Sequence, residues 1–222
     1  NTAIGQGALY NCTVSDNTAV GNHCLLNPST GIQNTALGSS AGYTLTTGQY
    51  NVYIGRRAGY ANATGSSNTA VGRSSMEDAT SAAEQNTCMG HTAGFACQSD
   101  NNTFLGYSAG STVTTGGNAI AIGAQAMDAT TSGEANIAIG VAAFSSANGS
   151  YNTAIGAQCL DALTTGGFNT GVGRGVLSEV TTGNNNTCVG YNAGFNVTSD
   201  ANTLVGYDAG VSMTTGGSNT IL

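Results

Sequence analysis

The residues that could carry out chemistry are few and widely separated in this sequence. The 222-residue chain has two histidines, His23 and His91, 11 Asp and Glu residues, four Arg and no Lys. Hydrolytic or acyl-transfer catalysis needs a nucleophile, a base and an orienting group within hydrogen-bond reach, and no spacing here indicates such a group. The adjacent carboxylates Glu77 and Asp78 are interpreted as a solvated turn. The sequence therefore predicts no catalytic residues and no enzyme.

Metal and cofactor sites are not indicated either. Asp16, Asp100 and Asp200 each follow a Ser at one recurring turn of the chain. Ser and Asp side chains can bond nearby backbone N–H groups and close a tight turn, whereas calcium-binding rolls carry a denser Gly-x-Asp pattern. We therefore predict turn capping, with no metal site and no cofactor.

The six cysteines are interpreted as small buried hydrophobic residues. They occur in pairs at three recurring places of the chain, and the two members of each pair are too far apart in the chain for a disulfide. A bridge within one coil, from Cys88 to Cys97, and a reactive thiol remain as alternatives. No zinc-ligand spacing is present.

Tyrosines and arginines that recur at one place form the candidate binding residues. Exposed Tyr and Arg can stack on sugars and donate hydrogen bonds to them. The alternative is that they cover a corner of the fold or a seam between chains. The candidate glycan contacts are Tyr107, Tyr191, Tyr207, Arg56, Arg73 and Arg174.

Composition excludes other kinds of partner. Charged residues make up 7% of the chain and the formal net charge is −7, whereas an average domain has roughly 25% charged residues. With four Arg as the only strong cations, no basic patch for nucleic acid is expected. No apolar run approaches the roughly 18 residues that span a bilayer, so this segment is not expected to contain a membrane span.

The elements that position all these residues come from one repeated motif, Asn-Thr-Ala-Ile-Gly, as at Asn152–Gly156. Copies recur every 16 to 18 residues, and a fixed short period is the mark of a repeat architecture. Positions are counted from the motif glycine, which is position 0. These glycines are Gly5, Gly21, Gly38, Gly55, Gly72, Gly90, Gly106, Gly123, Gly140, Gly156, Gly173, Gly190 and Gly206. A fourteenth copy begins at Asn219, so we expect residues 1–222 to be one repeat array and a fragment of a longer fibre protein.

The columns of the repeat predict an all-β fold. Position −1 is always aliphatic or Met, position +3 is mostly Ala, and position +7 is partly apolar. No segment has a sustained 3.6-residue period, so helices are not expected. Each coil is predicted to form a strand, a Gly turn, a second short strand and a Gly turn back. Stacked coils give a parallel β-roll or β-solenoid of about thirteen coils of 16–18 residues. Asn at position −4, replaced only by Ala119, predicts a hydrogen-bonded side-chain ladder.

The faces of the strand predict association between chains. Successive strand residues point to opposite faces, so position −1 shares a face with Thr at −3, and position −2 with Asn at −4. We expect −1 to fill the coil's own core and −2 to face another chain, because both faces are apolar. The predicted interchain face is Ala3, Ala19, Ala36, Tyr53, Ala70, Cys88, Phe104, Ala121, Ala138, Ala154, Cys188 and Leu204. Identical chains would associate most simply about a threefold axis, and a monomeric solenoid is the alternative.

The motif also resembles known repeats. Asn118–Gly123, Asn-Ala-Ile-Ala-Ile-Gly, resembles the repeat of YadA-like heads in trimeric autotransporter adhesins, and the Asn-Thr-Ala-Ile-Gly form resembles repeats of phage or phage-like tail fibres. The resemblance covers essentially the whole chain, although the period is longer than that of the adhesin heads. It implies a left-handed β-roll, a homotrimer, an extracellular place on a cell or virion surface, and a glycan or protein receptor.

The leading functional hypothesis is a non-enzymatic structural and adhesive segment of a trimeric extracellular fibre, for surface attachment or host recognition. A purely structural filament or surface-layer component is one alternative. An ice-binding β-solenoid is another, because Thr recurs at position −3. Ice binding needs exposed ranks of Thr, and this Thr shares its face with the aliphatic residue that we expect in the core.

Overall fold

The structure is a computed structural model that describes residues 1–79, 82–146 and 148–222. It contains two compact units, Asn1–Thr114 and Thr115–Leu222. Each coil contributes one short strand, and no helix occurs in the described ranges. The strands of the first unit are β1 (Thr2–Ile4), β2 (Thr18–Val20), β3 (Thr35–Leu37), β4 (Val52–Ile54), β5 (Thr69–Val71), β6 (Thr87–Met89) and β7 (Thr103–Leu105). Those of the second are β8 (Ile120–Ile122), β9 (Ile137–Ile139), β10 (Thr153–Ile155), β11 (Thr170–Val172), β12 (Thr187–Val189), β13 (Thr203–Val205) and β14 (Thr220–Ile221).

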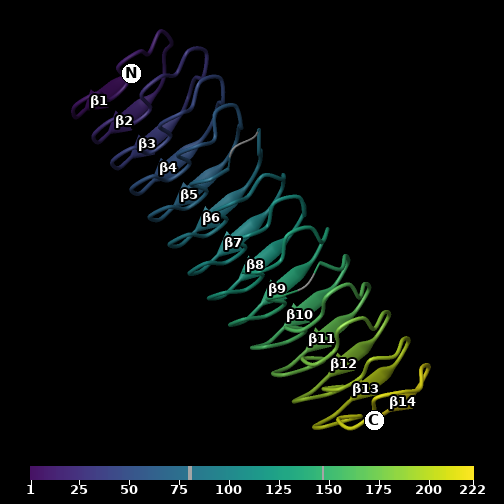
Figure 1. Ribbon diagram of the computed structural model, residues 1–222. Coiled ribbons are helices and arrows are strands. Elements are labelled where there is room, and N and C mark those ends of the chain that lie inside the picture. The colour runs from purple at the N-terminus through teal and green to yellow at the C-terminus, as the bar shows by residue number, and fades with distance from the viewer. Residues whose placement is uncertain (80–81, 147) are drawn as a thin grey trace. The chain divides into compact units, whose positions relative to one another are not determined.

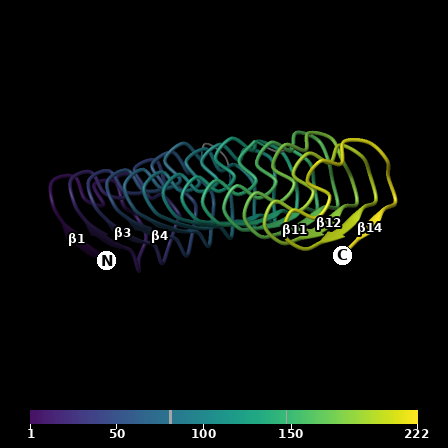
Figure 2. The same ribbon diagram turned by 90° about the horizontal axis from the view of Figure 1, so that it is seen from below.

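Within each unit the strands lie side by side in chain order and run parallel (Figure 1). Equivalent repeat positions pair with each other, as Thr2 with Thr18 and Ile4 with Val20. Seen from below, successive coils appear as loops with their strands along one side (Figure 2). The predicted all-β parallel solenoid is therefore confirmed.

The predicted second strand is wrong. After the motif glycine the chain forms a series of turns, in which positions +2 and +4 have positive φ, as in Arg57 (58°) and Gly59 (59°). Turns and bends continue through positions +6 to +9, where the second strand was predicted, as at residues 112–115. The coils remain joined along these turns, because Arg57 N–H donates to Ser39 O at 3.0 Å and Gly59 N–H donates to Ser75 O at 2.9 Å.

The Asn column forms the predicted ladder inside the coils. Asn51 donates from its backbone N–H and from its Nδ2 to Asn34 Oδ1, both at 3.0 Å. Its Nδ2 also donates to Gly65 O, at position −7 of the next coil, at 2.9 Å. Asn51 Oδ1 accepts from the backbone and side chain of Asn68 in the same way. These amides are buried, so the ladder pairs polar groups that water cannot reach.

The ladder determines which face of the strand is internal. The Asn amide reaches the carbonyl at −7 only from inside the coil, and alternation then turns position −2 inward and positions −3 and −1 outward. The predicted interchain face is therefore wrong, and the roles expected for Ala154 and Ile155 are exchanged. Ala19, Ala36, Tyr53, Ala70, Cys88, Phe104, Ala121, Ala138, Ala154, Cys188 and Leu204 are buried within their own coils. Ala3, in the first coil, is exposed.

The core is filled jointly by positions −2 and +4. A large residue at −2 faces Gly at +4: a Cβ on Gly59 would lie 2.5 Å from Tyr53 Cε1, and one on Gly110 would lie 2.6 Å from the Phe104 ring. Where −2 is Ala, as at Ala154, position +4 is usually large, here the buried Leu160. This exchange of volume keeps the interior close-packed.

Candidate ligand-binding surface

The outward strand positions form one face in each unit. This outer face consists of the residues at positions −3, mostly Thr, and −1, aliphatic or Met. Ile4 is 60% exposed, Leu37 46% and Ile155 37%. Parallel strands lie about 4.8 Å apart, so the face presents a rank of Thr beside a rank of apolar side chains. Apolar surface that is continuous in this way is typical of an interaction site.

Position +1 holds a ladder in the first unit. Arg73 Nη1 donates to His91 Nε2 at 2.9 Å. The His91 and Tyr107 rings stack with centroids 5.6 Å apart and an interplanar angle of 7°. Tyr107 is 55% exposed. We call Arg73, His91 and Tyr107 the first ladder.

The second unit has an equivalent arrangement at the same position. Arg174 Nη1 donates to Tyr191 Oη at 2.9 Å, and its guanidinium carbon lies 5.6 Å from the Tyr191 ring centroid. Tyr191 stacks on Tyr207 at 5.3 Å and 8°. Tyr207 is 76% exposed. We call Arg174, Tyr191 and Tyr207 the second ladder.

The structure thus brings five of the six candidate glycan contacts into two ladders. Arg56 lies at the same position, in the coil before Arg73, and is exposed. His91 was missed by the sequence reasoning, although its place between Arg73 and Tyr107 in one column was a signal that could have identified it.

A shallow pocket of about 310 Å³ lies beside the first ladder. It is lined by Thr92, Phe95, Ser108, Ser111 and Thr112. Thr92 and Ser108 directly follow the two ladder rings in the chain, and their hydroxyl oxygens are 2.9 Å apart. The pocket therefore combines hydroxyl groups with one aromatic side chain next to an exposed aromatic platform.

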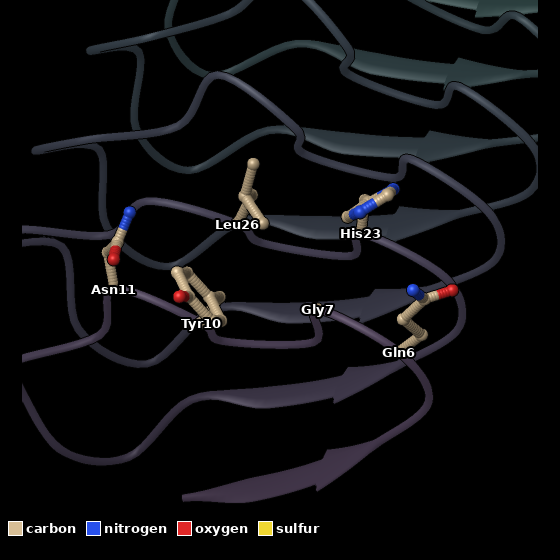
Figure 3. Close-up of a pocket in the computed structure, with 6 residues that line it drawn as sticks. All are labelled: Gln6, Gly7, Tyr10, Asn11, His23 and Leu26. Atoms are coloured by element: carbon tan, nitrogen blue, oxygen red, sulfur yellow. The ribbon is translucent and has the colours of Figure 1, made fainter.

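A second pocket, of about 380 Å³, lies at the same repeat positions of the first two coils. It is lined by Gln6, Gly7, Tyr10, Asn11, His23 and Leu26, and Figure 3 shows Tyr10 and Leu26 between Asn11 on one side and Gln6 and His23 on the other. A Cβ on Gly7 would lie 2.5 Å from His23 Cδ2, so the glycine leaves room for that ring. The amides are paired between coils: Asn11 Nδ2 donates to Asn27 Oδ1 at 2.6 Å.

Other surface stacks lie at different repeat positions. Tyr43 stacks on Tyr60 at 5.1 Å, with the Arg57 guanidinium 4.4 Å from the Tyr60 centroid. Arg57 also forms an ion pair with Glu77. Glu77 is 9% exposed, so the prediction that it lies in a solvated turn is wrong, whereas the adjacent Asp78 is exposed.

The cysteine thiols are free and mostly buried, which confirms their interpretation as small core residues. Five are buried and Cys12 is half-buried. Burial raises the pKa of Cys97 to about 11 and that of Cys159 to about 12, so both remain protonated thiols at neutral pH. The alternative Cys88–Cys97 bridge is not formed.

Two of the three recurrent aspartates bond a backbone N–H of the preceding coil, and not one in their own turn as turn capping would require. Asp100 Oδ1 accepts from Glu84 N–H at 2.8 Å, and Asp200 Oδ1 accepts from Asn184 N–H at 2.7 Å. Among the described residues, no group of three or more His, Cys, Asp or Glu is placed to hold a metal ion. Nor does any helix in that part of the chain have the length and apolarity to cross a membrane.

Comparisons with protein-family models, with curated proteins and with solved structures found no match.

Proposed function

We propose that this chain is a non-enzymatic segment of an extracellular fibre, in which identical chains associate through the outer face. The observation that carries the proposal is the uninterrupted rank of partly exposed aliphatic side chains on that face. The coil interior is already filled, so these apolar residues have no partner within their own coil.

The apolar surface is large enough to favour association. Fully burying an aliphatic side chain contributes roughly 1.5–3 kcal/mol, so one that is about 40% exposed has about 0.5–1 kcal/mol left to gain. Position −1 is exposed to 36% or more at three places in the first unit and five in the second, and these eight side chains contribute about 4–8 kcal/mol together. That total is comparable with the roughly 4–15 kcal/mol that association costs. Contacts made by the neighbouring Thr side chains would then decide the affinity.

The narrowness of the outer face favours a threefold arrangement. Each strand has three residues at most, so the face is only two side chains wide. Three such narrow faces can surround one axis and bury their aliphatic ranks together. The resemblance to trimeric adhesin heads and tail-fibre repeats supports the same arrangement, together with an extracellular role in surface attachment.

Light scattering tests the proposal directly. The wild-type chain should have a mass about three times its 21.9 kDa, and Ile155→Asp with Leu37→Asp should reduce that mass while circular dichroism stays unchanged. Tyr151→Ala is the matched control, because this exposed residue lies at position −5, outside the strand Thr153–Ile155 that carries the outer face. A stable wild-type monomer at about 100 µM would contradict the proposal.

Ice binding is a second candidate, because the Thr side chains at position −3 lie on the outer face and not in the core, where they were expected. The Thr rank points outward with the aliphatic rank, at a spacing of about 4.8 Å. A flat, regular array of hydroxyl and methyl groups is the surface that ice binding requires. Inhibition of ice recrystallisation by a monomeric chain would favour this function, and its loss in Thr153→Lys with Thr170→Lys would assign it to the outer face.

A further inference from the structure

The two ladders are not required by the fold. Position +1 holds Ala124, Val141 and Ala157 in other coils, and those coils form the same strand and turns. Stacked, exposed aromatic rings at this position therefore need another explanation. Because the rings are exposed, contact with a ligand is a direct explanation.

The composition of the ladders indicates what they would bind. Exposed tyrosine rings offer an apolar face to the C–H face of a sugar and a hydroxyl group to its edge. Three of the four arginines of the chain lie at position +1, and a guanidinium group binds carboxylates in a bidentate manner. Each ladder begins with one of these arginines. One ligand that offers both kinds of group is a sugar chain that carries carboxylates.

We propose that each ladder, with the polar surface beside it, is a binding site for acidic oligosaccharides. In the first unit the pyranose ring lies against Tyr107, the carboxylate contacts Arg73, and the hydroxyl groups of Thr92 and Ser108 contact the sugar edge. This inference rests on the proposed fibre function and names the class of receptor. Arg73 keeps further N–H groups for a ligand, since its contact with His91 uses one of five donors.

The second unit repeats this chemistry with different residues. Residues 86–117 and 186–217 match at 19 of 32 positions. The ring stays aromatic where His91 becomes Tyr191, and Thr92 and Ser108 become Asn192 and Asp208, which remain polar. The Asp208 side chain is partly exposed and directly follows Tyr207 in the chain. An acceptor beside the exposed Tyr207 fits a sugar hydroxyl group.

Charge predicts how the binding should respond to salt. The chain has a formal net charge of −7, which repels anions at long range. Attraction must therefore come from the local arginines, and contacts between exposed charges weaken when salt screens them. Stacking on tyrosine persists in salt. Acidic sugars should thus lose affinity with added salt while a stacking contribution remains.

The test uses the 222-residue chain and three oligosaccharide probes: hexagalacturonate, α2,3-sialyllactose and neutral maltohexaose. Binding is followed by tyrosine fluorescence, since the chain has no Trp, and by saturation-transfer NMR. At least one acidic probe should bind more tightly than maltohexaose, and the tighter of the two identifies the source of the carboxylate. Tyr107→Ala with Tyr207→Ala should weaken that binding by roughly tenfold or more.

Two further variants separate the contribution of the arginines from that of the ladder rings. Arg73→Gln with Arg174→Gln should remove the preference for the acidic probe over maltohexaose. Tyr151→Ala removes an equally exposed ring that stacks on Phe168 at another repeat position, and it should bind like the wild type. Failure of both acidic probes to bind, or equal loss in Tyr151→Ala, overturns the inference. If the chains still associate, that failure leaves the fibre proposal intact.

Discussion

Removing one rung of the Asn ladder tests the physical basis of the fold. In Asn51→Ala the backbone N–H and one Nδ2–H of Asn68 lose their acceptor, and Gly65 O loses a donor. A buried donor left without a partner costs about 1–3 kcal/mol, and each of the other lost bonds costs about 0.5–1.5 kcal/mol. We expect the free energy of unfolding to fall by about 2–5 kcal/mol, a large fraction of a typical domain's stability.

Guanidinium-induced unfolding followed by circular dichroism measures this loss. The matched control is Asn22→Ala, the same chemical change at an exposed residue with one side-chain bond to Gln6 at 3.3 Å. It should cost less than about 1 kcal/mol. Asn51→Asp sharpens the test. A carboxylate can still accept from Asn68, but it has no N–H to donate to Asn34 Oδ1 and Gly65 O and repels both oxygens. The stability of this variant should recover as the pH falls. Equal stability of Asn51→Ala and Asn22→Ala would refute the reasoning.

Three further predictions concern the core, the interrupted ladder and the thiols. Gly59→Ala should destabilise the chain by more than about 1 kcal/mol, because its φ is 59° and its Cβ would meet the Tyr53 ring; thermal melting measures this. Ala119→Asn should raise the melting temperature if the ladder stabilises each coil, since it supplies the acceptor used elsewhere in that column. The free energy of unfolding should be constant below a pH of about 9 and decrease above it. Burial raises the pKa of Cys159 to about 12, so between these pH values this thiol ionises only in the unfolded chain. Cys159→Ala should reduce the decrease in denaturation curves between about pH 8 and 11.

The repeat period made most of the fold predictable. A constant spacing of the Asn-Thr-Ala-Ile-Gly motif implies that equivalent residues stack, so the parallel register, the missing helices and the Asn ladder follow from the columns alone. The second strand could not be predicted in this way. Residues 112–115 contain Val113 and three Thr, which favour strands, but they form turns and bends, which residue preference alone does not indicate.

The orientation of the strand was predicted wrongly for an identifiable reason. Both faces are apolar, and the larger residue, such as Ile155, was assigned to the core. The decisive constraint is polar: the amide of Asn152 must reach the carbonyl of Gly166, at 3.0 Å, and this turns Ala154 inward. The side chains at positions −2 and +4 vary inversely in size, which also indicates that position −2 points inward. Tyr53 with Gly59 and Ala154 with Leu160 already show two positions that share one interior.

The two ladders were predictable in part. The recurrence of Tyr and Arg at position +1 identified the column, because stacked coils place such residues about 4.8 Å apart. His91 lies between Arg73 and Tyr107 and contacts both, but it is neither a Tyr nor an Arg. The adjacent pocket is lined mostly by residues at positions +2 and +5, so it depends on the exact course of the turns after the motif glycine, which the sequence pattern could not reveal.

Cross-linking between chains tests most directly the claim that the outer face joins them. In a Cys12→Ala background, a cysteine is placed either outward, in Ile139→Cys, or inward, in Ala138→Cys. The account predicts that mild oxidation gives disulfide-linked chains with Ile139→Cys and none with Ala138→Cys. Cross-linking by Ala138→Cys, or none by Ile139→Cys in chains that light scattering shows to be associated, would contradict it.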